Sequence, residues 1–393
     1  KYIDNACYHS INYYENINLL SFINLSKKES YDYYVNNMKY THILYGIKTK
    51  NIKFNLLLKI LYQIKYQHVQ SYDELVCTIN KDHPFFEKYD KEYIEINILL
   101  LISRKNDTFV LEEKDNSILF YSNNIYQKKI VSSIFYNENS IKFLEKQNLE
   151  KVLSFDFKDN LKEFHNLKDE IFNYDYITQE NIMITSSTIL MLLGLRKNND
   201  TDVYVDKVKN GENIINTFSK IKNVDFQVKN TDKWPMYWDK WLDEWAQKCG
   251  AKYFEEILGF HDYHFYYCGI KFMDLDVDIQ RRITRSRPAS CTDLVMLNKT
   301  YNLNITLPKI PETYFEYKKV ETLSEKEKDK LLEEGAIYNP DNREYKIEKK
   351  TNITVFIKRM QDYFKTRYKN DLSSDQIKDL FGMKKKIKIK IKK

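Results

Sequence analysis

The stretch that decides the fold spans residues 182–206 and reads IMITSSTILMLLGLRKNNDTDVYVD. Its pattern predicts a turn, a short apolar helix, a polar loop and a strand. Ser186 and Ser187 are of the type that begins helices, and Gly194 is of the type that ends them. Residues 201–205 then predict a strand, because β-branched and aromatic side chains are frequent there. The stretch therefore favours a fold that mixes helices and strands.

Asp200 and Asp202 open this strand and are two residues apart. Side chains two apart on a strand share a face, so both carboxylates are expected to point the same way. Two like charges that lie close together repel each other unless a cation balances them. A divalent metal ion is the simplest such cation. The alternative is a strand whose two aspartates face water.

These elements resemble the signature of the nucleotidyltransferase superfamily. That signature is a Gly-Gly or Gly-Ser turn, a short helix, a Gly-Leu-Arg-like turn and Asp-x-Asp on the next strand. Here Ser186-Ser187, Gly194-Leu195-Arg196 and Asp200-Thr201-Asp202 hold these places. The likeness is closest to the minimal and abortive-infection-type branches and covers roughly a third of the chain. It departs from the family at the turn, where Ser186 carries a side chain and the family has glycine.

The resemblance implies an α/β (α+β) fold, with a nucleotidyltransferase-like mixed sheet flanked by helices. It implies a metal-dependent enzyme that moves a nucleoside monophosphate from a nucleoside triphosphate to a hydroxyl acceptor, which is a protein, a nucleic acid or a small molecule. Asp200 and Asp202 would be catalytic and would hold Mg²⁺ or Mn²⁺ together with a third carboxylate. Asp225, in the predicted strand 224–228, is the first choice for this third ligand, and Asp274 is the second.

Five residues are expected to bind the triphosphate. They are Ser186, Ser187 and Arg196 near the turn, and Arg285 and Arg287 in an arginine-rich segment further along the chain. Arginine suits phosphate because its guanidinium donates two parallel hydrogen bonds. The alternative for this segment, which also holds Arg281 and Arg282, is pairing with nearby aspartates such as Asp274, Asp276, Asp278 and Asp293.

A competing function is a non-catalytic protein that keeps this fold as a scaffold, for example a virion or complex component. The serine at the turn and the many aromatic residues favour it. The abundance of Tyr, Asn, Ile and Lys resembles proteins from AT-rich genomes, including giant DNA viruses.

The patterns along the chain predict four parts. Residues 1–134 form an N-terminal α/β domain with a hairpin at 108–121, and residues 135–180 form a helical connector. Residues 181–307 form the nucleotidyltransferase-like domain, and residues 308–393 form a helical C-terminal extension with a basic tail. All four tryptophans fall in residues 234–245 at helical spacing, which indicates either a core stripe or a platform that stacks bases.

The basic tail at residues 384–393 holds seven of the 63 basic residues, so the remaining 56 balance the 56 acidic residues. Overall charge therefore does not indicate a nucleic-acid partner, although the tail is a candidate for weak contact with nucleic acid or anionic surfaces. The five cysteines are scattered and fit reduced thiols in the cytoplasm, which would be the host cytoplasm or the virion if the chain is viral. No apolar run reaches the length of about 20 residues that a transmembrane helix needs.

Overall fold

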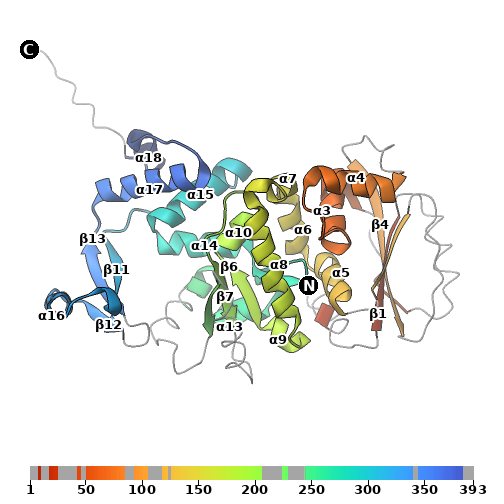
Figure 1. Cartoon of the computed structure of the whole chain (residues 1–393), viewed down its shortest axis with the longest axis horizontal. Helices are drawn as coiled ribbons and strands as arrows, with labels where there is room; N and C mark the ends of the chain where they lie inside the picture. Colours follow the sequence, from red (N-terminus) through yellow and green to blue (C-terminus); the bar gives the residue numbers. More distant parts are fainter. Residues whose placement is uncertain are drawn as a thin grey trace, which may run out of the picture. The chain divides into compact units, whose positions relative to one another are not determined.

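The computed structural model divides the chain into two compact units (Figure 1). The residues it describes are 8–9, 17–24, 42–45, 50–84, 93–104, 117–122, 125–205, 224–228, 243, 245–339 and 344–383. The first unit comprises Lys1–Gln227 and Glu255–Leu275, and the second comprises Val228–Phe254 and Asp276–Lys393. The four-part division stays a prediction.

An antiparallel sheet opens the first unit. Its strands are β1 (Ile17–Asn24), β2 (His42–Tyr45), β3 (Lys50–Lys53), β4 (Tyr93–Arg104) and β5 (Ser117–Ser122). The order is β2-β4-β1-β5, with β3 also paired to β4. Strand β4 pairs with three neighbours, as expected of a nearly continuous apolar run. The predicted hairpin stays a prediction, because residues 105–116, which include its first arm and turn, lie outside the described part; its second arm, β5, pairs with β1.

Two helices of the first unit lie between β3 and β4 along the chain, and the others follow β5. They are α3 (Phe54–Ile64), α4 (Tyr72–Asp82), α5 (Ile125–Phe135), α6 (Glu138–Lys146), α7 (Leu149–Val152), α8 (Lys158–Phe172) and α9 (Tyr176–Glu180), with a 3₁₀ turn, η2 (Phe155–Phe157), before α8. The predicted helical character of residues 137–176 is confirmed. The ends follow the usual capping chemistry, since the side chain of Ser71 accepts a hydrogen bond from the backbone of Glu74 and that of Asn137 from the backbone of Ser140.

A second sheet, which is mixed, completes the first unit. Its strands are β6 (Ile182–Thr185), β7 (Thr201–Val205), β8 (Val224–Val228), β9 (His264–Tyr267) and β10 (Ile270–Met273), in the order β8-β7-β6-β10-β9. Strand β6 is antiparallel to β7 and parallel to β10. Helix α10 (Ser187–Leu192) packs against β6 and β7, as predicted (Figure 1). On β9 and β10, the rings of Phe265 and Phe272 stack at 5.3 Å, and Phe143 of α6 stacks on Phe265 at 4.0 Å.

Short helical elements border the second sheet, and one glycine shapes its β9–β10 turn. The helical elements are α13 (Phe254–Gly259) and η3 (His261–Tyr263). Gly269 lies in the turn with φ +77°, and a Cβ atom there would come within 2.9 Å of the ring of Phe172. This close approach explains why the turn needs glycine.

The second unit contains helices and a small sheet. Its helices are α14 (Leu275–Arg285), α15 (Pro288–Tyr301), α16 (Glu325–Glu333), α17 (Ile353–Tyr368) and α18 (Ser374–Leu380), with a 3₁₀ turn, η4 (Val320–Thr322). Pro288 begins α15, a position that suits its fixed φ. A core of buried apolar side chains from α15, α17 and α18 holds these three helices together. Within the described residues, no helix is long and apolar enough to cross a bilayer.

The C-terminal part, predicted to be helical, contains a small sheet besides its helices. Strands β11 (Thr313–Lys319), β12 (Ile337–Asn339) and β13 (Glu344–Lys350) form an antiparallel sheet in the order β11-β13-β12. On β13, Tyr345 and Ile347 are buried and pack near Leu331. They alternate with charged residues, and this period of two was obscured by the high charge of the segment.

Candidate functional site

The candidate site is built from β6, α10 and β7, in the order that the sequence predicts. Strand β6 ends at Thr185, Ser186 makes the turn, and α10 follows directly. The polar loop after Gly194 then returns the chain to β7. Because Thr185 is the register partner of Asp202, the acidic start of β7 lies beside the Ser186 turn.

Ser186 has a backbone conformation that glycine normally adopts, with φ 66° and ψ −124°. A residue with a Cβ atom in this region carries strain of about 1–3 kcal/mol. Such strain persists only where the surrounding structure enforces it, and it is frequent at functional sites. The turn therefore has the backbone shape of a glycine turn although its residue is serine.

Hydrogen bonds tie the loop at residues 195–200, which ends in Asp200, to α10. The side-chain amide of Asn198 donates to Thr188 Oγ1 at 3.0 Å and to Thr201 Oγ1 at 2.9 Å. The hydroxyl of Ser187 lies against Asn198 Oδ1, and it is 2.7 Å from the carbonyl oxygen of Asp200 and 3.4 Å from its Oδ1. These bonds place Asp200 next to the first residue of α10.

Helix α8 supports the same loop from another side. The amide of Asn160 donates to the carbonyl of Asn198 at 2.9 Å, and the backbone N–H of Asn198 donates to Asn160 Oδ1 at 3.3 Å. The loop before β7 is thus held by both α8 and α10. Sequence reasoning missed Asn160 and Asn198, although an asparagine within such a polar loop is a common signal of side-chain to backbone bonding.

The carboxylates at this site are accessible. Asp200 is exposed and Asp202 is half-buried. Strand β8, which carries Asp225, is the direct neighbour of β7, but the side chain of Asp225 lies outside the described part of the chain. Among the described side chains, no group of three His, Cys, Asp or Glu residues converges on one point. Two aspartate carboxylates are the hard oxygen ligands that Mg²⁺ and Mn²⁺ prefer.

The three predicted phosphate ligands near the turn differ in how exposed they are. Ser186 is half-buried at the turn itself. The buried hydroxyl of Ser187 is engaged within the loop, and the side chain of Arg196 is only 5% exposed and donates to the carbonyl of Lys197 at 3.0 Å.

The arginine-rich segment belongs to the second unit, whereas Asp200 and Asp202 belong to the first. Arg285 is half-buried and Arg287 is exposed. Arg281 and Arg282 pair with Asp278 at 2.9 and 2.7 Å, so for these two arginines the ion-pair alternative is confirmed.

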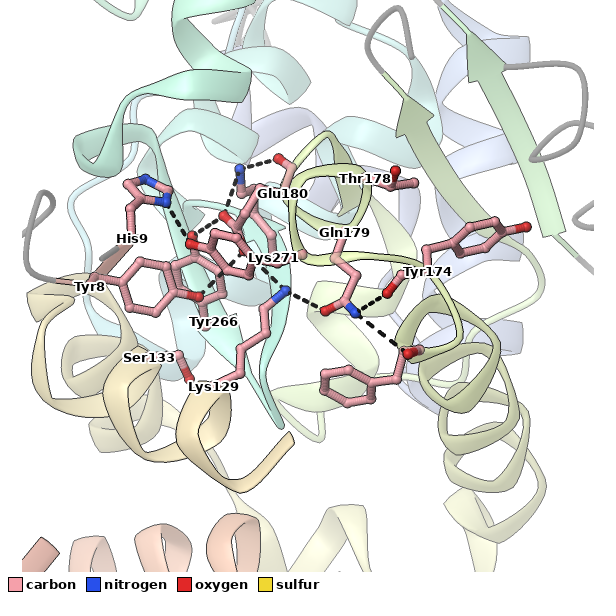
Figure 2. Close-up of polar contacts among 12 residues, drawn as sticks. Tyr8, His9, Lys129, Ser133, Tyr174, Thr178, Gln179, Glu180, Tyr266 and Lys271 are labelled. Atoms are coloured by element: carbon pink, nitrogen blue, oxygen red, sulfur yellow. Dashed lines mark hydrogen bonds and ion pairs between the residues drawn. The ribbon is translucent and has the colours of Figure 1, made fainter. Parts of the chain in front are cut away.

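A buried charged cluster that the sequence did not reveal lies elsewhere in the first unit (Figure 2). The carboxylate of Glu180, at the end of α9, lies 3.0 Å from Lys129 Nζ and 3.2 Å from Lys271 Nζ. Tyr266 donates to it at 2.7 Å, and Tyr8 at 3.4 Å. The cluster therefore links α5, α9, β9, β10 and the short segment at residues 8–9.

In this cluster, burial and the neighbouring charges shift the pKa values in opposite directions. Burial by itself raises the pKa of Glu180, but the charges of Lys129 and Lys271 and the bond from Tyr266 outweigh it, so its pKa lies below the usual range. Burial lowers the pKa of Lys129, and Glu180 opposes this effect. Burial also lowers the pKa of the nearby His261 to about 4, which leaves this imidazole neutral at pH 7.

The position of Lys271 inside an otherwise apolar strand, Gly-Ile-Lys-Phe-Met, is the signal that could have indicated the cluster. Its ammonium group also donates to the carbonyl of Leu258 at 3.1 Å and to that of Glu180. Because these acceptors belong to the protein itself, the cluster has the character of a structural ion-pair core.

The tryptophan segment lies mostly outside the described residues. Trp245 is described, is fully buried, and packs on Phe254 with ring centroids 5.6 Å apart. Trp234, Trp238 and Trp241 fall in the part that is not described. For Trp245, the core alternative is the one that the structure supports.

Comparison of the chain with protein-family models, with curated proteins and with solved structures finds no match.

Proposed function

We propose that the protein is a metal-dependent nucleotidyltransferase. It would transfer a nucleoside monophosphate from a nucleoside triphosphate to a hydroxyl group, using a nucleotidyltransferase-like domain that includes the mixed sheet. The observation that carries the proposal is the pairing of Asp202 with Thr185 directly before the Ser186 turn. Two carboxylates thus lie beside a turn with a glycine-type backbone, and the resemblance assigns this place to the metal and the triphosphate.

Asp200 and Asp202 would hold one or two Mg²⁺ or Mn²⁺ ions, with Asp225 as the third ligand. Such ions neutralise the triphosphate and make the acceptor hydroxyl a better nucleophile. In the reaction, the acceptor oxygen forms a bond to the α-phosphorus while the bond from that phosphorus to the bridging oxygen breaks. Pyrophosphate leaves, and the acceptor's proton passes to solvent or a nearby base.

The chain's own part in this reaction is to position the carboxylates before the metal binds. Asn198 and Ser187 fix the loop onto α10 through the bonds given above. A preorganised loop loses little conformational entropy when it takes up a ligand. On this account Ser187 orients Asp200, and Ser186 is the residue of the turn that remains for phosphate.

The competing function is a non-catalytic scaffold, and one observation favours it. The hydroxyl of Ser187 and the side chain of Arg196 are buried, although both were expected to bind phosphate. On the scaffold account, Asp200 and Asp202 face water and bind neither metal nor nucleotide.

Incubation with each α-labelled nucleoside triphosphate and either Mg²⁺ or Mn²⁺ tests the proposal, with total RNA, total protein and the chain itself as acceptors. The unmodified protein is expected to transfer label, and Asp202→Asn is expected to lose at least about a hundredfold of the rate, or about 2.7 kcal/mol of transition-state stabilisation. Asp169→Asn, an exposed aspartate on α8, is the matched control and keeps the rate. Absence of labelling with all four nucleotides, or equal labelling by all three proteins, would contradict the proposal.

A further inference from the structure

An apolar groove lies within the second unit, among α15, α17, α18 and the segment at residues 305–312. Its volume is about 1170 Å³. Apolar side chains that line it include Val295, Leu307, Ile310, Phe364, Leu380 and Phe381. Leu380 is 42% exposed, and Ile353, at the start of α17, is 49% exposed. Apolar surface of this kind is costly to leave in water, so the groove is a candidate binding surface.

The charges around the groove are mostly positive. Lys299, Lys309 and Lys350 line it and are exposed, and Glu312 is the acidic residue in its lining. None of the three lysines forms an ion pair with a carboxylate among the described residues. The seven lysines of residues 384–393 follow directly after Met383, which also lines the groove. A partner that complements this surface therefore carries negative charge next to apolar side chains.

Shape distinguishes between the possible partners. The groove volume of about 1170 Å³ is close to the upper limit of about 1,000 Å³ for small-ligand pockets, so the charges around the groove indicate the partner more directly than its volume does. A lipid bilayer is a flat surface and does not fill a concave groove. Grooves between helices are typically filled by one face of an amphipathic helix, through apolar side chains at positions i, i+3, i+4 and i+7.

We propose that this groove binds an acidic amphipathic helix of a partner protein. The apolar face of that helix contacts Leu307, Ile310 and Leu380, which line the groove and are at least partly exposed. Its Asp or Glu residues face Lys299, Lys309 and Lys350. This inference is independent of the proposed enzymatic function, because the groove lies in the second unit and the carboxylates of the candidate site lie in the first.

Fluorescence anisotropy with the full chain tests the proposal. The probe is a labelled peptide of about 18 residues, or five helical turns, with leucines on one face and glutamates on the other. Leu380→Glu is expected to weaken binding at least about tenfold, since it places a charge in the groove. Val355→Glu is the matched control, because Val355 is 44% exposed on α17 but does not line the groove. The affinity of this variant for the peptide is expected to stay within about twofold of that of the unmodified protein.

Charge is tested by a second pair of variants. Lys299→Glu is expected to weaken peptide binding about fivefold or more. Lys358 is an exposed residue of α17 outside the groove, so Lys358→Glu is expected to leave the affinity unchanged. The weakening shrinks at high salt, where exposed charges are screened.

Four outcomes of the binding measurements with the full-length chain would overturn the proposal. They are failure of the acidic peptide to bind, equal binding of a peptide with lysines in place of the glutamates, equal affinity of Leu380→Glu and Val355→Glu, and preferential binding of anionic vesicles with the same sensitivity to Leu380→Glu. Deletion of residues 384–393 is expected to weaken peptide binding. Tighter binding after this deletion would show that the tail itself occupies the groove, and it would also overturn the proposal.

Discussion

Replacing Glu180 with glutamine is expected to destabilise the first unit by about 3–5 kcal/mol, because it removes one side of a buried ion-pair cluster. Glutamine keeps the shape of the side chain but not its charge. The side chains of Lys129 and Lys271 are only 2% and 3% exposed, so neither ammonium group reaches water once its counter-charge is gone. A loss of this size is a large part of the total of about 5–15 kcal/mol that stabilises a typical domain.

Thermal unfolding of the unmodified and Glu180→Gln proteins measures this loss. For domains of 150–250 residues, 1 kcal/mol corresponds to about 2–4 °C, so the melting temperature is expected to fall by about 6–20 °C. Glu163→Gln is the control, because Glu163 is an exposed residue of α8. Its effect is expected to stay within about 0.5 kcal/mol.

The dependence on pH separates the ion pairs from simple packing. The pKa of Glu180 is lowered in the folded protein, whereas in the unfolded chain it is about 4.3. The stabilisation is therefore present above about pH 4.3 and is lost as the pH falls towards the folded-state pKa. The difference in the free energy of unfolding between the unmodified and Glu180→Gln proteins should therefore shrink as the pH falls. A loss below about 1 kcal/mol at pH 7, or a difference that is the same at pH 7 and at about pH 3.5, would refute the ion-pair account.

Three further changes have defined outcomes. Asn198→Ala should cost about 1–3 kcal/mol in thermal unfolding, because it removes the hydrogen bonds that the side-chain amide donates to the buried hydroxyl groups of Thr188 and Thr201; Asn199→Ala, at the exposed neighbouring residue, should have no measurable effect. In a denaturant titration, Asp278→Asn should cost the second unit about 3–5 kcal/mol, since it leaves two buried guanidinium groups without this carboxylate. The control Asp276→Asn, at an exposed residue, should shift the free energy of unfolding by less than about 0.5 kcal/mol. Deletion of residues 384–393 should leave the melting temperature nearly unchanged, because like charges along the tail oppose its packing, and a loss of several degrees would contradict this.

The parts of the fold that were predicted well are those with local causes. The strands at residues 201–205 and 224–228 agree with the sequence pattern, because their alternation is visible within five residues. The helix starts at Ser324 and Ser373 have a local cause of the same kind, since each serine forms a capping box with the residue three positions later. In each case the signal and the structure that it specifies lie within a single element.

The parts that were not predicted depend on contacts between distant residues. Glu180 meets partners at positions 8, 129, 266 and 271, and no spacing along the chain indicates this meeting. The parallel pairing of β6 with β10 is of the same kind. At the candidate site, the order of the elements was predictable, but the internal bonding of Ser187 was not, because it depends on how the loop folds back onto α10.

Calorimetric titration of a nucleoside triphosphate with Mg²⁺ into the unmodified and Asp202→Asn proteins tests the central claim most directly. The account predicts metal-dependent binding to the unmodified protein and binding at least about tenfold weaker to the variant, equal to about 1.4 kcal/mol. The fold of the variant should be as stable as before or slightly more stable, because neighbouring carboxylates without a cation repel each other. Absence of binding to the unmodified protein, or equal binding to both proteins, would contradict the claim that Asp200 and Asp202 hold a metal ion through which the protein binds a nucleoside triphosphate.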